Sequence, residues 1–380
     1  MSKLSEMIAR LCPNGVEYKK LGEVARICRG VRVVRKELIE NGKYAVYQNS
    51  LKPLGYYNEA NVKGGTAFVI GAGAAGEVGY SEQDFWAADD CYYIDGGDQL
   101  IGRYVYYCLT SRQSWLESKT RKASIPRLSR DFIAALEIPL PPLPVQREIV
   151  QILDNFANLT AELTAELAKR KKQYEHYRDS LLNFTGGGRY DKFGVESGEF
   201  RVEWKRLGEI AEIGTGSSNT DEQLDEGKYP FFVRSQDVRW KNEYEYDETA
   251  IITSGDGVGV GKIFHYHEGK YALHQRAYRV HVFVDQVLPK YIFYYMKNGF
   301  LSYIQKNAFQ SSVTSIRKPM LLNFPIPLPP LAEQERIVAI LDRFDSLCNS
   351  LTEGLPAEIA LRKKQYEYYR DKLLSFKEAS

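Results

Sequence analysis

Long apolar runs are missing from this chain. None of its 380 residues lies in an uninterrupted stretch of the roughly 18 apolar residues that a membrane-spanning helix needs. Residues 1–10 also lack the charged-then-apolar order of a secretory signal peptide. We therefore expect a cytoplasmic protein with no membrane partner.

Cysteine and net charge are both low. The five cysteines are widely spaced and include no Cys-x-x-Cys pair, so they predict reduced thiols and argue against a disulfide framework, a zinc ribbon or a redox site. The formal net charge is only +2. Because nucleic-acid-binding surfaces are usually basic, any such surface must be local.

Motifs that mark an enzyme are also missing. There is no Asn/Asp-Pro-Pro-Tyr/Phe tetrapeptide of amino-methyltransferases, no helicase motor motif and no Asp…Glu-x-Lys nuclease pattern. The glycine-rich segments 71–76 and 255–262 are not phosphate loops, because Asp256 stands at the first required glycine of the second segment and Ile263 replaces its Ser/Thr. Both segments predict tight turns between strands.

Histidines gather in one short segment. Four of the five lie close together in the sequence, at His265, His267, His274 and His281. A His-x-His pair on a strand would aim two rings to one face, but no clear third ligand accompanies it, so we predict no metal site.

An internal repeat is what the chain does contain. Three blocks recur in the same order: 16–25 returns at 202–211 with seven of ten positions identical, 139–156 at 327–344 with twelve of eighteen, and 170–184 at 362–376 with twelve of fifteen. Between the first two blocks the copies diverge, over 26–123 and 212–311. Two variable modules therefore alternate with two near-identical ones.

Each near-identical block predicts a long amphipathic helix. Apolar residues follow Pro-Leu-Pro-Pro at three-and-four spacing, and a helix over 145–184 would be about 60 Å long at 1.5 Å per residue. The second copy carries a similar stripe, interrupted by Gly354-Leu-Pro356, which predicts a kink or break. Within the first helix Thr-Ala-Glu-Leu occurs twice, at 160–163 and 164–167, and each copy adds about one turn. The two stripes favour packing against each other.

The variable modules contain short β-rich runs broken by glycine turns. Examples are 66–70, 90–94, 229–233 and 278–284. Each module is predicted to be an α+β globule.

Basic and polar side chains in the variable modules are candidates for DNA contacts. The arginine guanidinium can form two parallel hydrogen bonds to guanine, and the lysine ammonium can pair with a phosphate. The alternative for each basic cluster is an ordinary solvent-exposed surface without a ligand. In the first module the candidates are Arg29, Arg32, Arg35, Lys36, Gln48, Asn49, Lys119, Arg121, Lys122 and Arg127. In the second they are Arg234, Gln236, Arg239, Lys241, Gln310, Ser312, Thr314, Arg317 and Lys318.

These blocks resemble those of a known family. The Leu-Gly-Glu openings, the Pro-Leu-Pro-Pro-Leu-x-x-Gln-x-x-Ile-Val-x-Ile-Leu-Asp-x-Phe segments, the Thr-Ala-Glu-Leu units and the Arg-Lys-Lys-Gln-Tyr-Glu-x-Tyr-Arg-Asp closings resemble DNA-specificity subunits of Type I restriction-modification enzymes, in the branch with tandem spacer repeats. The resemblance implies a non-catalytic adaptor with two target-recognition domains, each reading one short half-site in the major groove. It also implies that the Thr-Ala-Glu-Leu count sets the gap between half-sites.

The resemblance implies partners as well. They are double-stranded DNA, two methyltransferase subunits and two restriction/translocase subunits. S-adenosylmethionine, ATP and magnesium are expected on those subunits, and no cofactor in this chain.

The predicted fold class is α+β. Two α/β target-recognition domains would be separated by two long helices, and the resemblance implies that these helices pack as an antiparallel coiled coil. The whole chain would then have an internal two-fold pseudo-repeat. The predicted boundaries are 1–138 and 186–326 for the recognition domains, and 139–185 and 327–380 for the helices.

A repeated chain can present equivalent surfaces to two copies of one partner. The near-identical helices are the natural docking sites. The candidate docking residues are Gln146, Ile149, Gln173, Tyr174, Tyr177, Arg178, Gln334, Ile337, Gln365, Tyr366, Tyr369 and Arg370.

Two other classes of function stay open at this point. One is a self-contained DNA methyltransferase or nuclease, which the missing motifs disfavour. The other is a coiled-coil scaffold without a DNA partner, which the large divergent modules disfavour. Binding of S-adenosylmethionine to the isolated chain would indicate the enzyme, and failure to engage duplex DNA with partner subunits present would indicate the scaffold.

Overall fold

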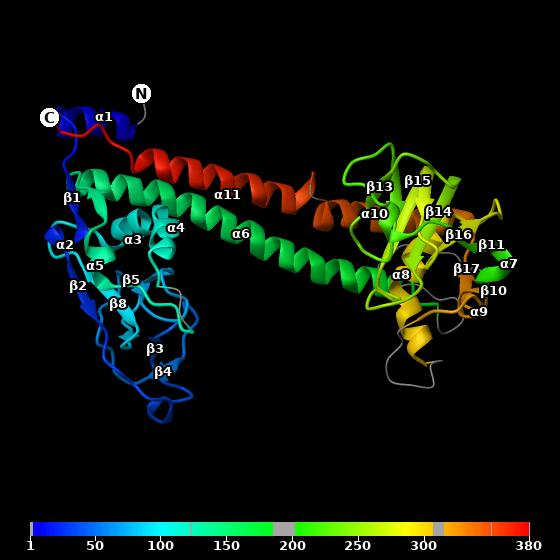
Figure 1. Cartoon of the computed structure of the whole chain (residues 1–380), viewed down its shortest axis with the longest axis horizontal. Coiled ribbons are helices and arrows are strands. Elements are labelled where there is room, and N and C mark those ends of the chain that lie inside the picture. Colours follow the sequence, from blue (N-terminus) through cyan, green and yellow to red (C-terminus); the bar gives the residue numbers. More distant parts are fainter. Residues whose placement is uncertain (1–2, 122–123, 185–201, 307–314, 351, 380) are drawn as a thin grey trace. The chain divides into compact units, whose positions relative to one another are not determined.

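The computed structural model describes residues 3–121, 124–184, 202–306, 315–350 and 352–379. The chain divides into two compact units, each drawn with its elements in Figure 1. Unit 1 comprises Met1–Thr164 and Glu358–Ser380, and unit 2 comprises Ala165–Ala357. Each unit therefore combines one variable module with parts of both near-identical blocks.

The near-identical blocks form the expected long helices. Helix α6 spans Leu143–Leu181 without interruption, and the division between the units falls within it, inside the second Thr-Ala-Glu-Leu copy. The second block forms α10 (Leu331–Asn349) and α11 (Gly354–Leu373). The predicted break is confirmed, because Gly354 adopts a φ of +76° that other residues rarely accept.

Unit 1 is a layered α+β globule. Its helices are α1 (Lys3–Leu11), α2 (Leu21–Val24), α3 (Gly102–Ser111), α4 (Gln113–Ser118) and α5 (Arg130–Ala134), with a 3-10 turn at Arg35–Glu37. Its strands are β1 (Tyr18–Lys20), β2 (Arg26–Arg29), β3 (Tyr44–Tyr47), β4 (Gly55–Tyr57), β5 (Thr66–Ile70), β6 (Val78–Ser81), β7 (Trp86–Ala87), β8 (Cys91–Asp95) and β9 (Glu137–Pro139). They form sheets in the orders β2-β8-β5-β6, β4-β3-β7 and β1-β9.

Unit 2 repeats this plan. Its remaining helices are α7 (Leu207–Ile210), α8 (Pro289–Lys306) and α9 (Lys318–Leu322), with a 3-10 turn at Thr220–Glu222. Its strands are β10 (Glu203–Arg206), β11 (Ala211–Thr215), β12 (Tyr229–Phe232), β13 (Arg239–Lys241), β14 (Tyr246–Ser254), β15 (Phe264–Leu273), β16 (Ala277–Val282) and β17 (Pro325–Leu328). They form one sheet in the order β11-β16-β14-β15-β12-β13 and the pair β10-β17.

The two sheet systems differ for one local reason. Strand β15 pairs with β14 on one side and β12 on the other, so unit 2 has a single six-stranded sheet. In unit 1 these two roles belong to separate strands, since β6 pairs with β5 and the short β7 pairs with β3. The four- and three-stranded sheets of unit 1 are thus the counterpart of the one sheet in unit 2.

Both globules pack on a helix of their own unit. Ile149 and Leu153 of α6 are fully buried in the core of unit 1, and Ile337 and Leu341 of α10 hold the same places in unit 2. Burying a side chain of this size stabilises a fold by roughly 1.5–3 kcal/mol. The apolar stripe of each conserved helix therefore packs against the globule of its own unit.

The helix pairs are also formed within each unit. In unit 1 the end of α11 lies alongside the first part of α6 (Figure 1), with the rings of Phe156 and Tyr369 stacked at 5.2 Å. In unit 2 Phe344 of α10 contacts Tyr177 of α6 at 5.4 Å. No helix in the described residues is both long and apolar enough to cross a membrane.

Candidate nucleic-acid interface

In unit 1, three loops far apart in the sequence meet through backbone hydrogen bonds. The carbonyl of Asn49, just after β3, accepts from the amide of Ala74 in the glycine turn between β5 and β6. The amide of Gly73 in the same turn donates to Pro126, and Ala72 forms a β-bridge with Arg127. The glycine turn therefore brings the predicted polar loop and the second basic cluster together.

Unit 2 brings the corresponding loops together through side chains as well. Arg234, just after β12, donates to the carboxylate of Asp256 in the glycine turn between β14 and β15, at 2.7 Å. Arg276, just before β16, donates to the other oxygen at 3.1 Å. Asp256 also forms a β-bridge with Ser315.

The carboxylate of Asp256 is held in its charged form. Partial burial would raise the pKa of this carboxyl, but the hydrogen bonds and charges of Arg234 and Arg276 outweigh that effect and keep the pKa below its usual range. Both guanidinium groups still face solvent, with side chains 40% and 61% exposed. The cluster therefore presents two oriented guanidinium groups at the surface.

Both glycine segments are turns, as predicted. Gly73 and Gly76 in unit 1 and Gly257 and Gly261 in unit 2 have positive φ, between +68° and +96°. A Cβ on Gly76 would meet backbone of Glu117 at 3.0 Å, so this position needs glycine for space as well as for conformation, whereas Gly257 has open space around it and needs glycine for conformation alone.

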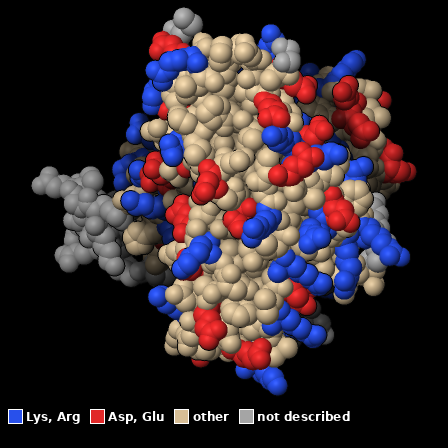
Figure 2. Space-filling view, turned by 90° about the vertical axis from the view of Figure 1, so that its left-hand side faces the viewer, with Lys and Arg blue, Asp and Glu red and all other residues tan. Residues whose placement is uncertain are grey.

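Most of the predicted DNA-contact residues lie at the surface. Arg29, Arg32, Arg35, Lys36, Asn49, Lys119, Arg121, Arg127, Arg234, Gln236, Arg317 and Lys318 are exposed, and Gln48 and Arg239 are half-buried. Lys122, Gln310, Ser312 and Thr314 lie outside the described residues. On the face that Figure 2 presents, basic and acidic residues are interspersed, in keeping with the small net charge.

One of these predictions needs correction. The ammonium group of Lys241 pairs with Glu222 at 2.6 Å and with the Ser218 hydroxyl at 2.9 Å, and its side chain is only 13% exposed. Its charge is already compensated inside unit 2. Lys241 is therefore not available for a DNA contact.

The helix-docking predictions need a larger correction. Gln146, Ile149, Tyr174, Gln334 and Ile337 are all buried within their units, so their side chains cannot form a surface for a partner. Tyr177, Tyr366 and Tyr369 contact other rings within their units; Tyr177 and Tyr366 are half-buried, whereas Tyr369 is exposed and stays a prediction. Gln365 is exposed, and Gln173, Arg178 and Arg370 are half-buried.

The two buried glutamines fix each globule to its helix. The side-chain oxygen of Gln146 accepts from the amide of Ile101 at 3.0 Å, and its nitrogen donates to the carbonyls of Gln99 and Pro141, both at 2.9 Å. Every polar atom of this buried amide is thus used. The residue closes the junction between the end of the β8–α3 loop and the start of α6.

Gln334 does the same in unit 2. Its oxygen accepts from the amide of Leu288 at 2.9 Å, and its nitrogen donates to the carbonyls of Gln286 and Pro329 at 3.1 and 2.9 Å. The sequence names both glutamines as docking candidates, but their spacing indicates the buried role, because each falls three residues before the isoleucine of the buried stripe and so on the same helix face.

A carboxylate of each conserved helix makes a second link. In unit 1 Asp154 accepts from the hydroxyl of Tyr107 and from Arg103, whose Nε lies 2.7 Å away. In unit 2 Asp342 accepts from Tyr294 at 2.5 Å and pairs with Lys290 at 3.0 Å. These acids hold the globules and are not a free catalytic pair.

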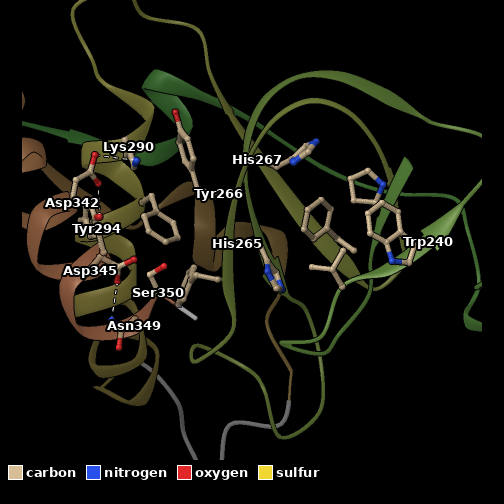
Figure 3. A pocket seen from close by; sticks show the side chains of 16 residues that line it. Trp240, His265, Tyr266, His267, Lys290, Tyr294, Asp342, Asp345, Asn349 and Ser350 are labelled. Carbon is tan, nitrogen blue, oxygen red and sulfur yellow. Dashed lines mark hydrogen bonds and ion pairs between the residues drawn. The ribbon is translucent and has the colours of Figure 1, made fainter. Parts of the chain in front are cut away.

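An open pocket of about 1070 Å³ lies at the surface of unit 2, beside this second link. Lys290, Tyr294 and Asp342 line its helix side, whereas His265 and His267 come from strand β15 (Figure 3). Each of the two imidazole rings has a backbone carbonyl within hydrogen-bonding distance, Ser235 at 3.0 Å and Lys270 at 3.2 Å. Among the described residues, no three metal-binding side chains gather at one point.

Comparison with known proteins decides the family. The model of the Type I restriction modification DNA specificity domain matches twice, over residues 13–170 and 201–361. The chain belongs to this family of Type I DNA-specificity subunits. It is a non-catalytic recognition subunit, and the internal repeat is the domain of the family written twice.

Individual specificity subunits agree. The chain is 38% identical to the specificity subunit of the EcoR124I/EcoR124II Type I restriction enzyme of Escherichia coli over 73% of this chain and 72% of that protein. It is 32% identical to a putative Type I specificity subunit of Haemophilus influenzae over 95% and 96%. The similarity to the second protein therefore spans nearly the whole of both chains.

Solved structures show the same fold. The S subunit of a Type I restriction-modification system from M. genitalium is similar, with a TM-score of 0.67 and 18% identity over 95% of this chain and 96% of that one. A chain from a structure of Type I complex assembly and conformational transition aligns with a TM-score of 0.58 and 19% identity over 96% and 98%. The α+β architecture with two sheet-rich domains is thus confirmed.

The sequence predicts the cluster of Arg234, Asp256 and Arg276 only in part. The sequence pattern draws attention to Arg234, but it marks Asp256 only as a departure from a phosphate loop and gives no sign for Arg276. The available signal was a single acid inside a glycine turn of a module otherwise rich in surface arginines. Their juxtaposition depends on sheet pairing between strands distant in the sequence, which the sequence pattern does not reveal.

Proposed function

We propose that this specificity subunit reads an asymmetric two-part DNA sequence, one half-site with the globule of each unit. It positions two methyltransferase subunits on that sequence, and two restriction/translocase subunits join them for cleavage. S-adenosylmethionine, ATP and magnesium belong to those partners. Type I complex formation by a structural relative supports this assignment.

One observation carries the proposal. Gln146 and Gln334 make the same three hydrogen bonds in their own units, so both globules are mounted on their helices in the same way. The surface loops of the globules nevertheless carry different residues. Identical mounting suits two copies of one partner, and different loops suit two unlike half-sites.

The backbone also supports different chemistry at matched places. The 3-10 turn of unit 1 carries Arg35 and Lys36, whereas the corresponding turn of unit 2 carries Thr220 and Asp221. Each turn is closed by a glutamate, Glu37 or Glu222, that accepts from the amide three residues earlier. The same fold thus displays opposite charges in the two globules.

Genome-wide mapping of methylated bases tests the proposal. A host expressing this chain with its methyltransferase subunit is compared with the same host lacking the chain. We expect a split, asymmetric methylated motif that disappears without the chain. An identical methylation pattern in both hosts would contradict the assignment.

A further inference from the structure

Backbone pairing within each globule shows which residues of unit 1 are structurally equivalent to which residues of unit 2. Parallel pairing places Tyr47 beside Ala87 in unit 1 and Phe232 beside Leu273 in unit 2. The hydrogen bond from Ala88 to Tyr47 recurs between His274 and Phe232. Two residues further along, Asn49 of unit 1 therefore holds the place of Arg234 in unit 2.

The glycine turns extend this set of equivalent residues. The carbonyl of Gly71 accepts from the amide of Leu128 at 2.8 Å, and that of Gly255 accepts from Ile316 at 2.7 Å. The next residues along the turns are Ala72 and Asp256, which are thus equivalent. Their bridge partners, Arg127 and Ser315, are equivalent for the same reason.

A fourth position follows from the same two glycines. The amide of Gly71 donates to the carbonyl of Asp90 at 2.7 Å, and that of Gly255 donates to Arg276 at 2.9 Å. Asp90 and Arg276 are therefore equivalent as well. Four positions in each globule are thus matched through main-chain bonds alone. In unit 1 Asn49 and Arg127 are exposed, Asp90 is half-buried, and the Ala72 side chain is buried.

We propose that these four positions select the bases of each half-site, an inference that rests on the proposed function. They will be called the rim positions. They are Asn49, Ala72, Asp90 and Arg127 in unit 1, and Arg234, Asp256, Arg276 and Ser315 in unit 2. The main chain is shared and every side chain differs, as two domains require when they place their reading groups alike but read unlike sequences.

The rim of unit 2 is built to read guanine. Asp256 orients Arg234 and Arg276 through one hydrogen bond to each of its oxygens. A guanidinium fork matches the O6 and N7 acceptors that guanine presents in the major groove. Orientation before binding lowers the conformational entropy lost on contact. Asp256 is thus a positioning residue for the arginines.

The rim of unit 1 has another chemistry. Asn49 is exposed and offers an amide, which pairs with the N6 and N7 edge of adenine. Arg127 is the exposed arginine of this rim, and it enters from the position that Ser315 occupies in unit 2. The unit 1 half-site is therefore expected to contain adenine and guanine in a different arrangement.

A second acid–arginine cluster, within the six-stranded sheet of unit 2, has a purely structural role and serves as a comparison. Arg279 is only 9% exposed in its side chain and pairs with Glu248 at 3.0 Å beneath the ring of Tyr246. That pair stabilises the interior of unit 2. The rim arginines differ because their charged ends remain open to a ligand.

The test uses the full chain with its methyltransferase subunits and maps methylated motifs for Asp256→Asn, Arg234→Gln and Arg276→Gln. We expect a roughly 10- to 100-fold loss of preference for guanine at one or two positions of a single half-site, because one bidentate contact supplies discrimination of this size. The other half-site should keep its preference. Asn49→Ala should produce the reverse, altering only the half-site that the unit 2 variants leave unchanged.

Glu248→Gln is the matched control, since it removes a carboxylate from an arginine of the same sheet away from the rim. It should lower stability and leave the motif unchanged. Unaltered preferences in all three unit 2 rim variants would overturn the inference, even if the wild-type chain directs a split motif. A wild-type chain that directs no motif would instead overturn the proposed function. The exposed arginine variants keep the test decisive should Asp256→Asn fail to fold.

Discussion

Tyr294 donates its hydroxyl hydrogen to Asp342, joining the first long helix of the unit 2 globule to the conserved helix beneath it. Tyr107 and Asp154 form the same bond in unit 1. The chain diverges through most of each globule, yet it repeats this tyrosine–aspartate bond. The structure therefore combines a constant contact between globule and helix with a variable surface on each globule.

The buried glutamines are expected to be strong contributors to stability. Gln146→Ala should lower the free energy of unfolding of unit 1 by about 3 kcal/mol, because each buried polar group left without a partner costs about 1–3 kcal/mol. Urea unfolding of the full chain measures the loss. Gln151→Ala, an exposed site on the same helix, should change it by less than about 0.5 kcal/mol. Equal losses in the two variants would refute the role.

The stacked rings should couple the helices of unit 1. A double-mutant cycle with Phe156→Ala and Tyr369→Ala is expected to give a coupling free energy of about 1 kcal/mol, the usual size for an aromatic pair. The cycle of Tyr177→Ala and Phe344→Ala in unit 2 should give a similar value. Additive effects in both cycles would show that the rings do not hold the helices together.

Alkaline pH should weaken the globule–helix junctions. Burial, and then the hydrogen bond to Asp342, raises the pKa of Tyr294 well above its usual value. The folded unit keeps the phenol protonated while the unfolded chain ionises near pH 10, so this stabilisation is complete below about pH 10 and is lost as pH rises further. The urea midpoint should therefore fall above pH 10, and less steeply in Tyr294→Phe. Tyr368→Phe, at an exposed tyrosine, should retain the wild-type slope.

Helix α6 should act as a spacer. Deleting Thr164–Leu167 removes one of the two Thr-Ala-Glu-Leu copies and shortens the helix by about 6 Å, with a rotation of about 40° beyond a full turn. We expect a shorter gap in the methylated motif and unchanged half-sites. Motif mapping of the deletion shows the result, and an altered half-site with an unchanged gap would refute this role.

Sequence periodicity predicted the helices well because their apolar stripe is a local signal. It located α6 within a few residues and placed the interruption at Gly354 correctly. The sequence also predicts strand β5 with its observed bounds, since Thr66–Ile70 is a short β-prone run of which residues 67–70 are buried. These features depend on neighbours in the sequence.

Side-chain roles were harder to predict. Gln146 and Ile149 look like a surface motif when identity between repeats is the only guide, but their identity reflects packing against the globule. In the sequence Lys241 resembles an unpaired surface lysine, but the carboxylate of Glu222, nineteen residues away, neutralises its positive charge. Long-range pairing decides the role of Lys241, and the sequence contains no local sign of that pairing.

The most direct test of two independent reading domains is a chain with one globule in both places. Replacing 21–138 with 207–326 keeps the glutamine junctions and puts the unit 2 globule on both mounts, and the reciprocal replacement does the same for unit 1. Methylation mapping with the methyltransferase subunit should then give two palindromic motifs, each an inverted repeat of one original half-site. Retention of the original asymmetric motif, or a motif unrelated to either half-site, would contradict the account.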